Sequence, residues 1–251
     1  MRIEVVTDPA AVGTTAAALV ADAVRDRPAL RLGVATGSSP EPLYAALVAH
    51  VRRGLDVRQV SAWALDEYVG LAPDHPEGYR AVVDRTVTRP LGLDPARVHV
   101  PDGSAGDPDA AARAYEAALT AAGGVDLQVL GIGHNGHLAF NEPGSDPASR
   151  TRAVPLTERT RAANARFFGG DVDAVPTRAI TQGLATILSA RRLLLVATGE
   201  DKAPAVAAAL TGPVGRQVPA SVVQLHADVT VVLDTAAAAL LPAGRRAATV
   251  S

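Results

Sequence analysis

The feature that most constrains this fold is a regular alternation of short apolar segments with longer amphipathic ones. Segments typical of β-strands occur at 3–6, 30–35, 60–65, 98–100, 127–131, 193–197 and 229–233. Segments typical of helices lie between them, at 9–25, 40–53, 79–87, 108–122, 157–168, 180–189 and 201–210, and an alanine-rich helix is expected after the last strand. This alternation predicts βαβ units, and therefore a mainly parallel sheet with helices on both faces.

Composition decides what can fill the core of such a fold. Apolar residues make up 48% of the chain and aromatic residues only 3%, so Ala, Val and Leu must pack between the sheet and its helices. No repeat, linker or domain boundary is evident. We therefore expect one α/β domain over residues 1–251.

Charge and residue usage exclude several classes of protein. The net charge is −2 without a basic run, which argues against a nucleic-acid partner because phosphate backbones demand a basic surface. The absence of cysteine excludes disulfides and thiolate metal sites. Neither an apolar stretch of 18 residues nor a signal-peptide pattern is found, so we expect a cytoplasmic protein with no membrane contact.

The loops that follow strands are the candidate sites, because parallel sheets bind ligands at the carboxyl ends of their strands. One such loop consists of Thr36, Gly37, Ser38 and Ser39 and leads into a helix. Backbone N–H groups and the helix dipole favour an anion there. An ordinary turn with Ser39 as the helix cap is the alternative, so this loop alone leaves phosphate binding open.

Two adjacent acids, Asp66 and Glu67, end the third predicted strand, where acidic residues are unfavourable. One of them could be a general base, whereas a solvated acidic loop is the alternative. Because side chains alternate along a strand, only one of the two is expected to face a cleft.

The segment 131–143 concentrates polar groups, namely His134, Asn135, His137, Asn141 and Glu142. Its glycines match the dinucleotide pattern G-x-G-x-x-G, but Pro143 and Pro147 prevent the helix that such a site requires. A histidine paired with a carboxylate can transfer protons near neutral pH. A zinc site formed by His134, His137 and Glu142 is an alternative, although its spacing is irregular.

Two cations stand out further along the chain. Arg166 precedes two of the three phenylalanines and is expected near a packed surface. Lys202 lies in the first turn of a predicted helix, where a cation opposes the helix dipole unless an anion lies between them. Simple compensation by Glu200 and Asp201 is the alternative.

In this order, the motifs closely resemble the glucosamine-6-phosphate deaminase (isomerase) family from about Leu32 to Leu233. The resemblance is carried by Leu65–Leu71, Gly136–Pro143, Ser149–Arg152, Ala163–Phe168 and Val223–His226. It implies a Rossmann-like α/β fold and a hydrolase that needs no organic cofactor and no metal. Members convert glucosamine 6-phosphate and water into fructose 6-phosphate and ammonium.

The resemblance also implies roles for individual residues. Asp66 matches the base that moves a proton from C2 to C1, His137 the acid/base that opens the sugar ring, and Glu142 its carboxylate partner. Asn135 stands where many members have an aspartate, and an amide can only orient by hydrogen bonding because it does not titrate. The family's phosphate site maps onto Thr36, Gly37, Ser38, Ser39, Arg166 and Lys202. Residues 144–170 match a lid over the site.

Regulation differs among members, some of which are activated by an acetylated amino-sugar phosphate at a subunit interface. Arg152 and Ser145 match part of that regulatory site, but Val154 replaces a lysine and the chain ends before a tyrosine used there. We therefore expect weak or no activation, and the choice between monomer and homo-oligomer stays open.

Two other functions are considered. A 6-phosphogluconolactonase-like hydrolase shares the fold but lacks the Phe-Asn-Glu-Pro and Asp-Glu-Tyr motifs found here. A non-catalytic sugar-phosphate sensor is expected to carry a DNA-binding helix pair or to lose an acid/base residue, and neither is seen, since Asp66, His137 and Glu142 are all present. No motif reports whether the substrate is the glucosamine or the galactosamine epimer.

Overall fold

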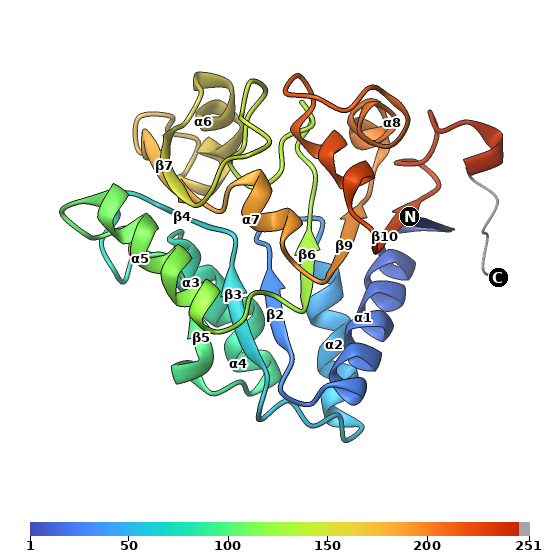
Figure 1. The fold of residues 1–251 in the computed structure, drawn as a ribbon, viewed down its shortest axis with the longest axis horizontal. Coiled ribbons are helices and arrows are strands. Elements are labelled where there is room, and N and C mark those ends of the chain that lie inside the picture. The colour runs from blue at the N-terminus through green and yellow to red at the C-terminus, as the bar shows by residue number, and fades with distance from the viewer. Residues whose placement is uncertain (246–251) are drawn as a thin grey trace.

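A computed structural model describes residues 1–245 as two sheets with their covering helices (Figure 1). The strands are β1 (Arg2–Val6), β2 (Arg31–Val34), β3 (Ser61–Ala64), β4 (Asp66–Tyr68), β5 (Val98–His99), β6 (Leu127–Leu130), β7 (Arg152–Pro155), β8 (Arg178–Thr181), β9 (Arg192–Ala197) and β10 (Val229–Asp234). The α-helices are α1 (Pro9–Asp26), α2 (Glu41–Arg52), α3 (Tyr79–Val83), α4 (Arg89–Leu91), α5 (Pro108–Ala121), α6 (Glu158–Asn164), α7 (Leu184–Leu188) and α8 (Ala203–Thr211). Among residues 1–245, no helix is long and apolar enough to cross a membrane.

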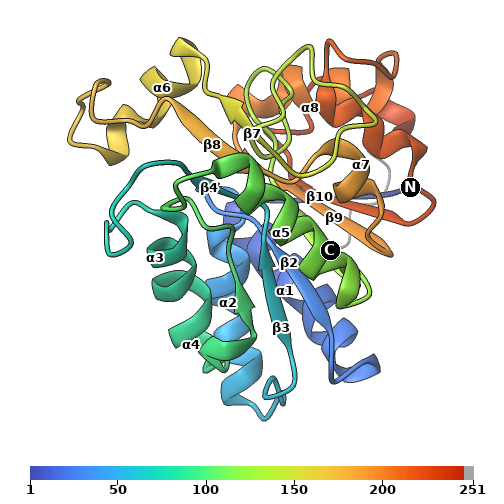
Figure 2. The ribbon, with the colours of Figure 1, turned by 60° about the vertical axis from the view of Figure 1, so that its left-hand side comes forward.

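The larger sheet has seven strands in the order β1-β10-β9-β6-β2-β3-β5, and all its pairs are parallel. The chain moves outward from β2 through β3 to β5, and in the opposite direction from β6 through β9 to β10. Right-handed crossovers therefore place α1 and α2 on one face and α5 on the other (Figure 2). The expected Rossmann-like α/β fold is confirmed. The strand order reverses between β2 and β6, and the loops that leave these two neighbours diverge and open a crevice.

Small aliphatic residues fill the core, as the composition predicted. The buried face of α1 consists of Val, Ala and one Gly, and β6, β9 and β10 are buried along almost their whole length. Gly33 of β2 shows how closely the strands pack. A Cβ atom at this position would lie 2.1 Å from Oε1 of Gln128 on β6, so the buried amide occupies space that any larger residue would need.

A second, antiparallel sheet of order β4-β8-β7 was not predicted. The chain leaves the parallel sheet at Leu65. The backbone N–H of Leu65 still donates to the C=O of Val34 at the end of β2, whereas its C=O accepts the backbone N–H of Gln182 after β8. The predicted helix 180–189 is wrong at its start, because Ile180 and Thr181 belong to β8 and α7 begins only at Leu184. Pairing with β4 and β7 overrides the local helical pattern.

The alanine-rich helix expected after β10 is also absent among the described residues, which form turns at 235–240 instead. The carboxylate of Asp234 accepts the backbone N–H groups of Ala237 and Gly199, and Pro242 follows within a few residues. These contacts hold the segment against the loop after β9, and the proline stops a helix from propagating.

Candidate active site

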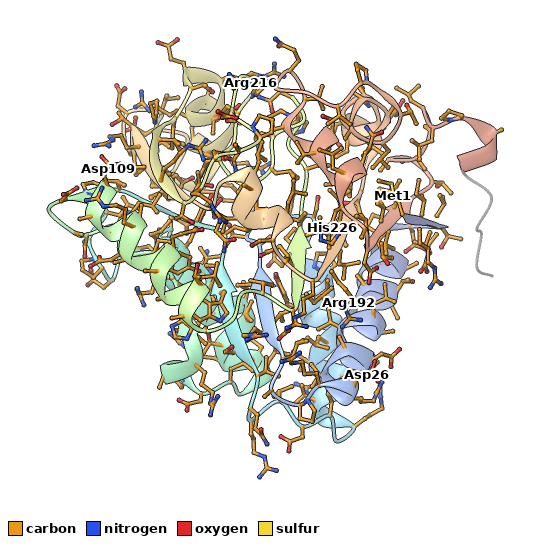
Figure 3. The ribbon with its side chains drawn as sticks, viewed as in Figure 1. Met1, Asp26, Asp109, Arg192, Arg216 and His226 are labelled. Carbon is orange, nitrogen blue, oxygen red and sulfur yellow. The ribbon has the colours of Figure 1, made fainter. Side chains whose placement is uncertain are left out.

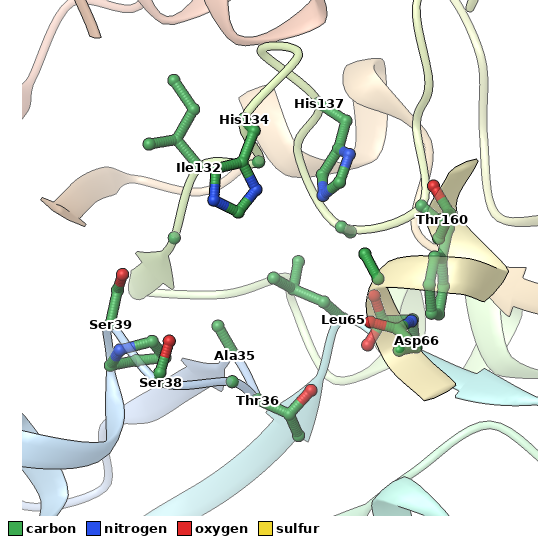
Figure 4. Close-up of a pocket in the computed structure, with 18 of the residues that line it drawn as sticks. Ala35, Thr36, Ser38, Ser39, Leu65, Asp66, Ile132, His134, His137 and Thr160 are labelled. Carbon is green, nitrogen blue, oxygen red and sulfur yellow. The ribbon is translucent and has the colours of Figure 1, made fainter. Parts of the chain in front are cut away.

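A pocket opens at the carboxyl ends of the parallel strands, at the point where the strand order reverses (Figure 4). Its walls come from the loops after β2, β3 and β6, from α6 and the turn that follows it, and from the turn before α8. Nearly all the predicted site residues line it, namely Thr36, Gly37, Ser38, Ser39, Asp66, Asn135, His137, Arg166 and Lys202. Glu142 does not line the pocket but contacts His137.

The adjacent acids Asp66 and Glu67 face different surroundings, as strand alternation predicted. Asp66 lines the pocket, whereas Glu67 accepts backbone N–H groups of Tyr68, Tyr79 and Arg80, each at 2.8 Å. Two of these donors form the first turn of α3, so Glu67 caps that helix. Burial raises the pKa of Asp66 well above its ordinary value, and the charge of Glu67 adds to the effect. The pocket therefore contains a carboxyl whose charged form the protein disfavours, a property suited to a general base.

His137 and Glu142 form a second ionisable group of the site. Nδ1 of His137 lies 3.6 Å from Oε1 of Glu142, and the same oxygen accepts a hydrogen bond from the hydroxyl of Thr160 on α6. Asn135 donates from Nδ2 to the other carboxylate oxygen at 2.6 Å and accepts from the backbone N–H of His137 at 3.2 Å. Burial alone would raise the pKa of Glu142, but His137, Thr160 and Asn135 outweigh it and lower that pKa to about 2. Glu142 is therefore an anion that lies against the imidazole of His137.

The loop that carries His137 is shaped by glycine and by one strained residue. A Cβ atom at Gly133 would lie 2.3 Å from the imidazole of His137, so only glycine leaves room for the ring. Ala139, which lines the pocket, has a φ of +52°, a conformation that costs a non-glycine residue about 1 kcal/mol. The close turn places His137 and Glu142 within contact of one another although four residues separate them.

The opposite end of the pocket is suited to an anion. Gly37 has a φ of +104°, and no side chain caps the N-terminus of α2 behind the loop 36–39, so Ser39 is not the helix cap that the alternative required. Arg166 and Lys202 line the same pocket. Burial lowers the pKa of Lys202, the charge of Arg166 lowers it further, and Asp201 partly opposes them. A bound phosphate dianion would relieve this repulsion between the two cations.

His134 lies between Lys202 and Asp201, which the sequence analysis did not foresee. Its Nε2 lies 2.6 Å from Oδ2 of Asp201, and its Nδ1 lies 3.3 Å from Nζ of Lys202. Figure 4 shows His134 on the side of Ser38 and Ser39, and His137 on the side of Asp66 and Thr160. Within residues 1–245, no group of three or more His, Cys, Asp or Glu side chains could hold a metal ion, so the geometry does not support the zinc alternative.

Several lining residues were missed because they come from segments without a distinctive motif. Tyr79 follows Gly78 at the start of α3 and stacks on Phe140, with ring centroids 5.9 Å apart. Arg159, Thr160 and Asn164 line the pocket from α6. Thr160 and Asn164 are four residues apart, so helical spacing puts them on one face of α6. This spacing could have been recognised in the sequence, because the helix was predicted close to a loop that follows a strand.

The chain is similar in sequence and fold to several known proteins. A model of the family Glucosamine-6-phosphate isomerases/6-phosphogluconolactonase matches residues 8–232. A glucosamine-6-phosphate deaminase of Streptomyces coelicolor is 54% identical over 96% of this chain and 93% of its own, and one of Mycolicibacterium smegmatis is 51% identical over 95% and 92%. A solved structure of a monomeric glucosamine-6-phosphate deaminase matches with a TM-score of 0.92 at 40% identity, over 96% of this chain and 100% of that one. A 6-phosphogluconolactonase from Trypanosoma cruzi matches with a TM-score of 0.78 at 19% identity, over 96% of each chain, and shares the fold.

Proposed function

Because the chain belongs to the family of glucosamine-6-phosphate isomerases and 6-phosphogluconolactonases, we propose that it converts glucosamine 6-phosphate and water into fructose 6-phosphate and ammonium. One observation carries the proposal. A single pocket contains a buried carboxyl at Asp66, an imidazole backed by a carboxylate at His137 and Glu142, and two cations at Arg166 and Lys202. These are the groups needed for proton transfer between carbons, ring opening and phosphate binding.

Ring opening is the first step and uses His137. The imidazole donates a proton to the ring oxygen of the sugar as the bond from C1 to that oxygen breaks, and it takes up the proton that the C1 hydroxyl loses as the aldehyde forms. Glu142 lies 3.6 Å from the imidazole, and because its pKa is lowered to about 2 it presents a negative charge to the ring near neutral pH. Asn135 holds the second oxygen of Glu142 and the backbone of His137, so its role is to orient the pair.

The isomerisation uses Asp66. In the open-chain sugar, the ionised carboxylate removes the proton from C2 while the C1 oxygen takes a proton from the ammonium group at C2, which gives an enolamine. Asp66 then returns its proton to C1, and the product is the 2-iminium form of fructose 6-phosphate. Water then adds to the imine carbon and ammonium leaves, which yields fructose 6-phosphate. Because water is consumed as the C–N bond breaks, we class the enzyme as a hydrolase, an aldose-ketose isomerising deaminase.

The phosphate end fixes the substrate relative to these groups. The backbone of Thr36–Ser39, the N-terminus of α2, Arg166 and Lys202 surround one end of the pocket. Binding energy gained at the phosphate positions C1 and C2 near Asp66, although the phosphate does not react.

We also propose that residues 1–251 act as one domain and that residues 144–170 form a lid, in which helix α6 covers the site. We further propose that the protein works in the cytoplasm, where phosphorylated sugars occur.

The test is a parallel assay of the purified protein on three substrates. Glucosamine 6-phosphate should yield ammonium and fructose 6-phosphate in equal amounts, and galactosamine 6-phosphate in the same assay decides the epimer. Hydrolysis of 6-phosphogluconolactone without ammonium release would favour the lactonase alternative. Binding of the amino-sugar phosphate without turnover would favour the sensor.

A further inference from the structure

His134 lines the pocket but has no part in the reaction proposed above. Both of its ring nitrogens are engaged, Nδ1 by Nζ of Lys202 at 3.3 Å and Nε2 by Oδ2 of Asp201 at 2.6 Å. The first partner is one of the two cations at the anion end. The ring therefore touches the phosphate-binding machinery directly.

These contacts determine where the imidazole carries its hydrogen. A lysine ammonium group has three donors and no acceptor, so Nδ1 of His134 must accept from Lys202. In the neutral ring the hydrogen then resides on Nε2, which donates it to the carboxylate of Asp201. A chain of hydrogen bonds thus runs from Lys202 through neutral His134 to Asp201.

The far end of this chain is held by buried groups. Asp234, at the end of β10, accepts the backbone N–H of Gly199 at 3.1 and 3.0 Å from its two oxygens. Gly199 has a φ of +92°, and a Cβ atom there would lie 2.7 Å from Oδ1 of Asp201. The turn that carries Asp201 is therefore fixed by the sheet beneath it, although the side chains of His134 and Asp201 are half exposed.

We propose that His134 is a positioning residue for substrate binding, which accepts a hydrogen bond from Lys202 and holds its ammonium group where the substrate's phosphate binds. The proposal rests on the proposed function, since it assumes that Lys202 meets a phosphate. The ammonium of lysine sits on a flexible four-carbon stem. Because His134 holds the ammonium group of Lys202 in place before the ligand arrives, less conformational entropy is lost when the ligand binds.

Two substitutions at one position and a matched control separate this role from a structural one. His134→Leu removes the acceptor at similar size, whereas His134→Asn retains an oxygen acceptor near the place of Nδ1. The control is His226→Asn. The ring of His226 is also held at both nitrogens, by the C=O of Ala190 and the N–H of Asp228, but at the amino ends of β9 and β10 (Figure 3).

The readouts at about pH 8 are KM and kcat for glucosamine 6-phosphate and the inhibition constant of inorganic phosphate. His134→Leu should raise KM and the inhibition constant by roughly three- to tenfold with kcat unchanged, and His134→Asn should restore most of the loss. His226→Asn should leave all three values as in the parent protein.

The proposal is overturned if His134→Leu binds phosphate as the parent protein does, if it lowers kcat at constant KM, or if Asn restores nothing. Should the parent protein release no ammonium, the proposed function fails by itself. Calorimetric titration with inorganic phosphate then still decides whether His134 supports the anion site.

Discussion

The adjacent acids Asp66 and Glu67 yield the sharpest prediction, because opposite tasks are assigned to them. Asp66→Asn should abolish turnover and leave the protein stable, whereas Glu67→Gln should weaken the fold and leave chemistry largely intact. The two substitutions remove the same charge from neighbouring positions and each is nearly isosteric. Each variant therefore serves as the control for the other.

The expected loss of stability for Glu67→Gln follows from its contacts. The carboxylate is buried and accepts three backbone N–H groups at 2.8 Å, two of them from the first turn of α3. A glutamine offers a single oxygen, so at least one buried N–H group loses its acceptor. The free energy of unfolding should fall by about 2 kcal/mol, the usual cost of a buried donor left without a partner.

The difference in stability between Asp66→Asn and the parent protein should depend on pH, in a direction that follows from the pKa of Asp66. Burial raises the pKa of Asp66 in the folded state above its ordinary value of 3.8. Below that value the carboxyl is protonated in both the folded and the unfolded state, so the variant should match the parent protein. As pH rises above it, the unfolded state ionises more easily, the parent protein loses stability, and Asp66→Asn becomes the more stable of the two.

Urea unfolding at about pH 3 and about pH 8, together with turnover at about pH 8, checks both variants. Asp66→Asn should lose a factor of about 10² to 10⁴ in kcat, the usual contribution of a general base. Glu67→Gln should keep kcat within a few-fold in conditions where it is folded. The reasoning is refuted if folded Glu67→Gln is inactive, or if Asp66→Asn is less stable at the higher pH than the parent protein.

Three further predictions concern other parts of the pocket. Lys202→Gln should raise KM for glucosamine 6-phosphate at least about tenfold, because it removes a contact with the phosphate. The inhibition constant of unphosphorylated glucosamine should be the same for the variant and the parent protein, because this sugar has no phosphate. Thr160→Val should raise the pKa of Glu142 above about 2 by removing one hydrogen-bond donor, and Thr160→Ser should restore it, as ¹³C NMR titration of the carboxyl would show. Gly133→Ala should displace the imidazole of His137 and lower kcat by about 10²-fold or more with unchanged circular dichroism; normal activity would contradict the close packing.

Much of the parallel sheet was predictable from the sequence. Buried parallel strands are continuous apolar runs, and Leu193–Ala197 and Val229–Leu233 fall within strands that the structure extends by one residue each. The polar residues that follow such runs were also identifiable, because a strand end in a parallel sheet is where ligands bind.

The second sheet was not predictable from local pattern. The strand β4 consists of Asp66, Glu67 and Tyr68, three residues of which two are poor strand formers, and it exists because β8 pairs with it. The same pairing converts Ile180 from an expected helical residue into a strand residue. Glu67 caps a helix, and His134 contacts Asp201 and Lys202, through partners that are 12 to 68 positions away in the sequence. Contacts over such distances cannot be predicted from the spacing of neighbouring residues.

The most direct test of the central claim is to measure ammonium and fructose 6-phosphate in one sample, for the parent protein and for folded Asp66→Asn supplied with glucosamine 6-phosphate. The predicted result is equal amounts of the two products from the parent protein, and an amount of both that is at least about 10²-fold lower from the variant in the same time. Undiminished formation of both products by Asp66→Asn, or no ammonium from the parent protein, would contradict the account.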